Sequence, residues 1–167
     1  MADLTYVSTW QAVCYAAFIV NVFSRYLVGW RVAVSLRTDL VLDALEQVVR
    51  VRSAYDLSGL VHHSDRGSRY LSIRYTEHLA DLQALVSVGS HGDSYDNALA
   101  ESVIELFKAE VVKKRKAPWR TVDELELATE RRVEWWNQSR LHGSLGDLPL
   151  AEFEATYHAQ RDGDAVA

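Results

Sequence analysis

Two carboxylates and one cation in the middle of the chain are placed where they could do chemistry. Asp65 follows the strand-like run Gly59–His63, and Glu101 lies near the start of a helical pattern. The 35 residues between the two acids are enough for one helix and one further strand, so this segment can fold back on itself. Lys108 lies seven positions after Glu101, which on a helix is within about 20° of the same azimuth. One helix face therefore carries a carboxylate and a cation.

The types of these side chains indicate which chemistry is available. Carboxylates with no nearby Cys pair and no helical His-x-x-x-His pattern favour hard divalent cations, Mg²⁺ or Mn²⁺, over zinc. Two such ions about 3.5–4 Å apart can activate a nucleophilic oxygen and stabilise the leaving oxygen of a phosphoryl transfer. A lone acid is more often a solvent-facing side chain or a helix cap. His62 and His63 point to opposite faces of their strand, so at most one faces the site, and a core or supporting role is favoured over ligation.

The helix that carries Glu101 has a separate packing face. Its apolar residues recur every three or four positions and form one stripe, consisting of Leu99, Ala100, Val103, Ile104, Phe107 and Val111. Glu101 and Lys108 flank this stripe, so we expect Glu101 at the rim of the core, facing a cleft. Asp96 or Asn97 can cap the start of the helix.

The remaining elements follow from periodicity and capping signals. Strands are predicted at Asp3–Val7, Val13–Val20, Leu27–Val34, Gly59–His63 and Leu85–Val88, and helices from Thr38 to Arg52, Tyr75 to Ala84, Thr121 to Trp136 and Leu150 to Tyr157. Thr38 is predicted to cap its helix, and Thr121 with Glu124 forms a capping box. This order predicts an α/β fold with a mixed sheet of about five strands flanked by helices. Ligands of such sheets collect where parallel strands end, and Asp65 is at such a place.

Length and composition indicate one ordinary domain. The chain has 167 residues, of which 49% are apolar, so residues 1–160 can build a core without disulfides, and residues 161–167 are expected to be a disordered tail. Cys14, the single cysteine, lies in an apolar run and is interpreted as a small buried hydrophobe, which fits a reducing cytoplasm. No apolar run has the length of a membrane span, and Met1–Asp3 lacks the pattern of a secretion signal.

The charge distribution matters more than the total. A formal net charge of −5 argues against a generic nucleic-acid binder. However, six cations stand within residues 108–120 against one acid, Glu110, and they are Lys108, Lys113, Lys114, Arg115, Lys116 and Arg120. This cluster fits a phosphate-contacting surface, and it equally fits a solvated helix end. Trp135 and Trp136 are 100° apart on a helix, so one is expected in the core and the other partly exposed.

Five motifs, in order, resemble the integrase-type core of bacterial insertion-sequence transposases, within the DDE and retroviral-integrase superfamily. They are Ala2–Val7, Phe23–Trp30, His62–Tyr70, Ser94–Ser102 and Asn137–His142. Each motif alone is weak, but together they cover nearly the whole chain and make a specific match. Two positions depart from the family pattern: Asn21 stands where an aspartate is common, and Leu150 follows Pro149 where a second proline is usual.

The resemblance implies a ribonuclease-H-like fold and a catalytic, metal-holding triad of Asp3, Asp65 and Glu101. It also implies that Lys108 contacts DNA, and the cluster Lys113, Lys114, Arg115 and Lys116 is expected to contact DNA phosphates beside it. The implied cofactors are Mg²⁺ or Mn²⁺, two ions. The implied partners are the DNA ends of the element, target DNA and further copies of the chain, in the bacterial cytoplasm at the nucleoid.

The sequence thus predicts a DDE transposase core that cleaves DNA and transfers strands. Two alternatives stay open: a truncated, non-catalytic remnant that binds DNA or intact transposase, and a ribonuclease-H-like hydrolase without strand transfer. The chain lacks the upstream DNA-recognition region of full-length family members, and only two residues precede Asp3. We therefore expect the first strand to be barely present and frayed at Asp3, and the chain by itself to have little activity.

Overall fold

A computed structural model of the chain describes residues 1–53, 57, 59–64, 72–88 and 98–164, with side chains described through Arg161. Five strands form one sheet in the order β3-β2-β1-β4-β5, and they are β1 (Ala2–Ser8), β2 (Val13–Val20), β3 (Leu27–Ala33), β4 (Val61–Ser64) and β5 (Leu85–Val88). Strand β2 is antiparallel to β1 and β3, whereas β4 is parallel to β1 and β5. The predicted mixed sheet is confirmed.

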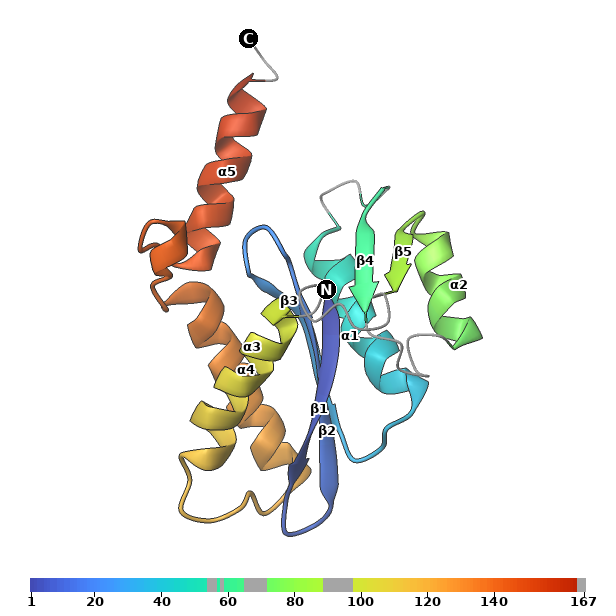
Figure 1. Ribbon diagram of the computed structural model, residues 1–167, viewed down its shortest axis with the longest axis vertical. Helices are drawn as coiled ribbons and strands as arrows, with labels where there is room; N and C mark the ends of the chain where they lie inside the picture. The colour runs from blue at the N-terminus through green and yellow to red at the C-terminus, as the bar shows by residue number, and fades with distance from the viewer. Residues whose placement is uncertain (54–56, 58, 65–71, 89–97, 165–167) are drawn as a thin grey trace.

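Helices cover both faces of this sheet. They are α1 (Thr38–Val51), α2 (Ile73–Asp81), α3 (Ala98–Phe107), the π-helical segment η1 (Lys108–Lys113), α4 (Val122–Gln138), the 3₁₀ turn η2 (Gly143–Leu145) and α5 (Leu150–Asp164). Figure 1 shows α3 and α4 on one side of the sheet and α1 and α2 on the other. Each face thus has its own hydrophobic core.

Strand β2 contributes to both cores because its side chains alternate between the faces. Phe18 packs with residues of α3 and α4, whereas Ile19 packs with residues of α1 and α2. A strand buried on both sides has a continuous apolar sequence, and this explains the run Val13–Val20. Cys14 is fully buried in the α3 side of this core, as expected, and burial raises the pKa of its thiol.

Strand β1 is complete at the end where the sequence indicated a frayed start. Asp3 pairs with Phe18 of β2, and the preceding Ala2 pairs with both β2 and β4. The amide of Val20 also donates to the carbonyl oxygen of Met1 (2.8 Å). The expectation that Asp3 lies on a fraying strand is therefore wrong, because hydrogen-bonded neighbours hold the strand from its first residues.

Several predicted helix ends also need correction. Thr38 is the first residue of α1 and not its cap, since Arg37 occupies the cap position without a side-chain hydrogen bond. Helix α2 begins and ends earlier than predicted, over Ile73–Asp81. Thr121 caps α4 as predicted, with the Glu124 amide donating to Thr121 Oγ1 (3.2 Å), but the Glu124 carboxylate accepts from the Arg120 amide (3.1 Å) and not from that of Thr121, so only half of the capping box forms. The proposed caps Asp96 and Asn97 lie outside the described residues.

Helix α5 continues through Asp164, past the predicted helix end at Tyr157. Residues 158–161 are compatible with a helix and contain neither Gly nor Pro, so no breaker ends it there. Figure 1 shows α5 projecting from the body of the molecule. Its first turns are anchored by the buried carboxylate of Glu154, which accepts hydrogen bonds from the Ser24 hydroxyl and from Arg52 (2.6 Å). None of the described helices has the length and apolarity needed to cross a membrane.

Candidate active site and basic groove

The carboxylate of Asp3 lies on the face of the sheet that α3 covers. Cross-strand partners in an antiparallel pair point to the same face, and the partner of Asp3 is Phe18. The Phe18 ring contacts Phe107 of α3, with ring centroids 5.0 Å apart. Asp3 is half-buried, and its Oδ1 accepts a hydrogen bond from the amide of Leu4 (2.7 Å). The β1 carboxylate and the helix that carries Glu101 therefore share one side of the sheet.

Asp65 lies outside the described residues, but the strand that precedes it is described. Strand β4 ends at Ser64, which pairs in parallel with Ala2. Ser64 and Ala2 each stand directly before one of the two predicted aspartates. The pairing between β1 and β4 thus involves the residue directly before Asp3 on β1 and the residue directly before Asp65 on β4.

His62 has a role in the core, as the sequence favoured. Its imidazole is buried, and Nε2 lies 3.1 Å from the hydroxyl of Tyr75 on α2. Because α2 packs on the sheet face opposite α3, His62 points away from the side of Asp3. Burial lowers the pKa of His62 to about 4, so the ring is neutral at pH 7.

Glu101 is exposed on α3, beside the buried stripe. The buried residues of this helix are Ala100, Val103, Ile104 and Phe107, which confirms the predicted packing face. Within the described part of the chain, no three His, Cys, Asp or Glu side chains cluster closely enough to hold a metal ion. Since Asp65 is not among those residues, convergence of Asp3, Asp65 and Glu101 stays a prediction.

Helix α3 passes directly into the π-helical segment η1, which the sequence did not predict. The apolar spacing continues through this segment, and Val111 remains buried, so periodicity alone carried no signal of the change. Trp119 stabilises η1 from outside, because its indole N–H donates to the carbonyl oxygen of Val111 (3.2 Å). π-Helical segments are rare in proteins, and those that do occur are frequently at functional sites.

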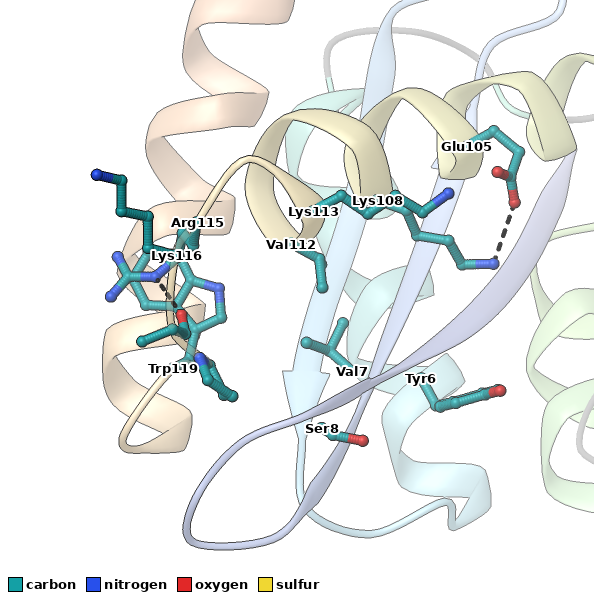
Figure 2. A pocket seen from close by; sticks show the side chains of 12 residues that line it. Tyr6, Val7, Ser8, Glu105, Lys108, Val112, Lys113, Arg115, Lys116 and Trp119 are labelled. Carbon is teal, nitrogen blue, oxygen red and sulfur yellow. Dashed lines mark hydrogen bonds and ion pairs between the residues drawn. The ribbon is translucent and has the colours of Figure 1, made fainter.

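A basic groove of about 540 Å³ lies between β1, η1 and the connection to α4. Its lining residues with polar or aromatic side chains are Tyr6, Ser8, Glu105, Lys108, Lys113, Arg115, Lys116 and Trp119. Figure 2 shows Lys108 and Lys113 on the helix, with Arg115, Lys116 and Trp119 in the connection that follows. Four of the predicted DNA-binding residues thus share one groove, whereas Lys114 does not line it.

Lys108 has a partner that the sequence analysis overlooked. Its amine lies 3.1 Å from Oε1 of Glu105, three positions earlier on α3 (Figure 2). A search for oppositely charged residues at this spacing would have found the pair. The Glu105 side chain is 62% exposed, and ion pairs this open contribute about 0–1 kcal/mol. The amine can therefore exchange the carboxylate for a phosphate at little cost.

The β1–β2 hairpin is hydrogen-bonded to the connection that carries Trp119. The amide of Trp10 donates to the carbonyl oxygen of Trp119 (2.8 Å), and the amide of Gln11 donates to that of Arg120 (3.2 Å). The guanidinium of Arg115 stacks over the Trp119 ring, 3.6 Å from its centroid. These contacts join the segment from Arg115 to Arg120 to the hairpin that follows the strand of Asp3.

Trp135 and Trp136 differ in burial as predicted, with Trp136 buried and Trp135 44% exposed.

Two models of the integrase core domain match the chain, one over residues 1–94 and the other over residues 83–149. The chain belongs to the integrase core domain family. It is 49% identical, over 99% of its length, to a putative transposase for insertion sequence element IS986/IS6110 of Mycobacterium tuberculosis. It is 50% identical, over its whole length, to the transposase for insertion sequence element IS629 of Shigella sonnei. The resemblance to insertion-sequence transposases is therefore confirmed, and the chain spans 60% and 55% of the lengths of these two relatives.

Solved integrase cores share the fold of this integrase core domain. The catalytic core domain of HTLV-2 integrase, in complex with magnesium, superposes with a TM-score of 0.69 at 14% identity, covering 91% of this chain and 92% of that one. The catalytic core domain of BIV integrase superposes with a TM-score of 0.65, covering 96% and 97%. The predicted ribonuclease-H-like fold is confirmed.

Proposed function

We propose that this integrase core domain is the catalytic core of a DDE transposase, and that it cleaves DNA and transfers strands during transposition of an insertion sequence. The observation that carries the proposal is the strand register. Ala2 pairs with Ser64, so Asp3 and Asp65 each follow one member of this pair, and Asp3 faces the side of the sheet where α3 carries Glu101. Sequence relatives that are named as transposases support the reaction class.

The donor set fits a hard divalent cation. Asp3, Asp65 and Glu101 would supply carboxylate oxygens, which are the ligands that Mg²⁺ and Mn²⁺ prefer. His62 points to the other side of the sheet and adds no nitrogen ligand to this set, whereas His63 alternates to the side of Asp3. One or two such ions, when bound, activate the attacking oxygen and stabilise the leaving oxygen of the phosphodiester.

The residues of the chain position the reaction. Asp3 lies on a strand that is hydrogen-bonded to β2 along its length and to β4 at Ala2, which restricts the position of its carboxylate. Lys108, Lys113, Arg115 and Lys116 offer cations along the groove that starts three residues further along β1, at Tyr6. Phosphate contacts of this kind hold DNA in register without reading its sequence. The groove thus provides the path of the DNA that enters or leaves the site.

We further propose that the active form is a homo-oligomer acting on DNA at the bacterial nucleoid. The integrase core of HTLV-2 has been solved in a trimeric and in a dimeric form, and a related intasome has been solved with a regulatory subunit of PP2A. These assemblies belong to those proteins. Sedimentation of this chain with and without terminal-repeat DNA tests whether DNA induces self-association here.

The reaction is tested with the purified chain, labelled terminal-repeat DNA and Mg²⁺ or Mn²⁺. Asp3→Asn and Glu101→Gln are expected to reduce nicking by more than about 100-fold, because each removes a metal ligand. Asp123→Asn and Glu130→Gln are the matched controls, since both acids are exposed on α4. They are expected to leave nicking unchanged.

The products separate the proposal from its alternatives. Joined DNA products in the presence of metal support strand transfer. Nicking without joining would favour a hydrolase of the same fold. DNA binding without nicking in either metal would favour a non-catalytic remnant, and it would overturn the proposed activity.

A further inference from the structure

A second cavity, of about 360 Å³, lies on the other flank of α3 from the basic groove. Its polar lining consists of Arg25, Ser102, Arg140, His142 and Ser144, and its apolar lining includes Leu99, Leu106 and Trp136. Within the described part of the chain, no Asp or Glu lines it. Ser102 donates its hydroxyl proton to the carbonyl oxygen of Ala98 (2.7 Å), so the donors left are the two arginines and Ser144. Without a lining carboxylate among the described residues, they make a site for an anion.

Two sequence motifs whose roles the active site does not explain meet in this cavity. Arg25 belongs to the motif Phe23–Trp30, and Arg140 and His142 belong to the motif Asn137–His142. Asn137 joins the two motifs, because its side chain accepts from the amide of Leu27 (3.0 Å) and donates to the carbonyl oxygen of Leu27 (3.0 Å). The side chain is buried and continues the hydrogen bonding of β3 at that end.

The backbone of Arg25 is held in an uncommon conformation. Its φ is +63°, in the left-handed region, which costs a non-glycine residue about 1–2 kcal/mol. The Arg25 amide donates to the carbonyl oxygen of Asn21 (2.8 Å), and the Arg25 carbonyl oxygen accepts from the indole of Trp136 (3.2 Å). Such strain persists only where the surroundings impose it, and it occurs frequently at binding sites. The backbone of Arg25 is therefore held at a fixed place on the cavity wall.

Arg140 is also fixed, and the local charge is positive. Its guanidinium stacks over the Trp136 ring, 4.6 Å from the centroid, and Nη1 lies 3.4 Å from Oε1 of Glu110. The same carboxylate pairs with Arg132, so one negative charge serves two cations. Burial lowers the pKa of His142, and the charges of Arg140, Arg25 and Arg132 lower it further. A positive field therefore acts on the cavity wall.

We propose that this cavity binds a phosphate of the DNA backbone, with Arg25 and Arg140 as its cations and the hydroxyl of Ser144 as a further donor. The choice of DNA rests on the proposed function. Ser102 directly follows Glu101, and the lining residues of the cavity and of the groove lie on opposite flanks of the buried face of α3. DNA that crosses the exposed ridge of α3 therefore contacts both surfaces.

The first test measures affinity for duplex DNA as a function of salt, in EDTA, so that no cleavage is needed. Arg25→Asn removes the charge and keeps a residue that tolerates a positive φ. It is expected to reduce the steepness of log K against log salt by about 0.9, the value for one lost phosphate contact. Arg131→Gln is the matched control, since Arg131 is exposed on α4 and does not line the cavity. Equal salt dependence of the two variants would overturn the proposal.

A second measurement identifies the source of the phosphate. NMR signals of the His142 ring are followed while inorganic phosphate or duplex DNA is added, because a bound anion raises the pKa of this imidazole. Shifts with both ligands, lost in Arg25→Asn, support the proposal. Shifts with inorganic phosphate alone would assign the cavity to a free ion and overturn DNA as its ligand.

A variant outside the Arg25 turn tests the cavity without altering the strained backbone of that turn. Ser144 is exposed in the η2 turn, so Ser144→Asp adds a carboxylate at the cavity without disturbing the core. It is expected to weaken DNA binding severalfold, and wild-type binding by a folded Ser144→Asp chain would contradict the proposal. Because all binding is measured without metal, loss of nicking in the active-site test does not affect this outcome.

Discussion

The groove and the cavity on the two flanks of α3 are both basic, but they are built in different ways. The four lining cations of the groove all come from one short run, Lys108 to Lys116, and these side chains are largely exposed. The cavity combines Arg25 with Arg140, which are 115 positions apart in sequence. The backbone of Arg25 is held by hydrogen bonds from and to its peptide groups, and the guanidinium of Arg140 is held by stacking on Trp136. The difference suggests a division of labour in which the groove supplies attraction to any DNA and the cavity defines the position of one phosphate.

The largest expected effect comes from breaking the tie that assembles the cavity. Asn137→Ala removes both hydrogen bonds to Leu27 and leaves a buried amide and a buried carbonyl unpaired. We expect the free energy of unfolding to fall by about 2–4 kcal/mol, measured by urea denaturation. Gln138→Ala, at the exposed neighbouring position, should change it by less than about 0.5 kcal/mol. Equal losses in the two variants would show that Asn137 does not hold this segment.

Removing the cations of the groove should change DNA binding more than any single change in the cavity. Lys108, Lys113 and Lys116 are replaced together by Gln. The slope of log K against log salt concentration for duplex binding is then expected to become shallower by about 2.7, three times the value for one phosphate contact. The loss should be similar for DNA of unrelated sequence, because phosphate contacts carry no base information. Lys114→Gln is the control, since Lys114 belongs to the same run but does not line the groove. If the triple variant bound only one DNA sequence more weakly and bound unrelated sequences as the wild type does, the role given to the groove would be contradicted.

Acidification should distinguish the two surfaces, because among the described lining residues the cavity has a histidine and the groove has none. The pKa of His142 is lowered in the fold, so the ring is neutral at pH 7 and gains a proton only below its ordinary range. Its contribution to stability is present above about pH 6.5 and is lost as the pH falls, because the unfolded chain binds this proton more readily. Protonation also adds a positive charge beside Arg25 and Arg140. The affinity of the cavity for sulfate, whose charge does not change over this pH range, should therefore increase severalfold in acid when followed by calorimetry, and a pH-independent affinity in a folded chain would refute this.

The smallest expected effect concerns the ion pair at the start of the groove. Glu105→Gln releases Lys108 from its partner and should strengthen duplex binding by about threefold at low salt, because an exposed pair contributes less than about 1 kcal/mol. The gain should disappear at high salt. Fluorescence anisotropy with the wild-type chain and Lys108→Ala alongside would measure it, and a gain that persists in a Glu105→Gln, Lys108→Ala double variant would exclude Lys108 as its cause.

Local sequence determined most of the elements and one of the two basic surfaces. The apolar run of β2, the stripe of α3 and the helix cap at Thr121 each depend on residues close in sequence, so their patterns can be read directly. The cation run from Lys113 to Lys116 is visible for the same reason. The family motifs named Asp3 and Glu101, and the structure places the side chain of Asp3 and the helix of Glu101 on one side of the sheet.

Only the tertiary structure decided the features that depend on partners distant in the chain. Strand β1 is ordered at Asp3 because β2 and β4 pair with it, although its own sequence indicated a frayed start. The π-helical turn after Phe107 keeps the apolar spacing of an α-helix and is stabilised by Trp119 from outside. The arginine cavity exists because Asn137 binds the backbone of Leu27 and Trp136 binds that of Arg25, contacts that span more than 100 residues. No window of neighbouring residues contains both ends of such a contact.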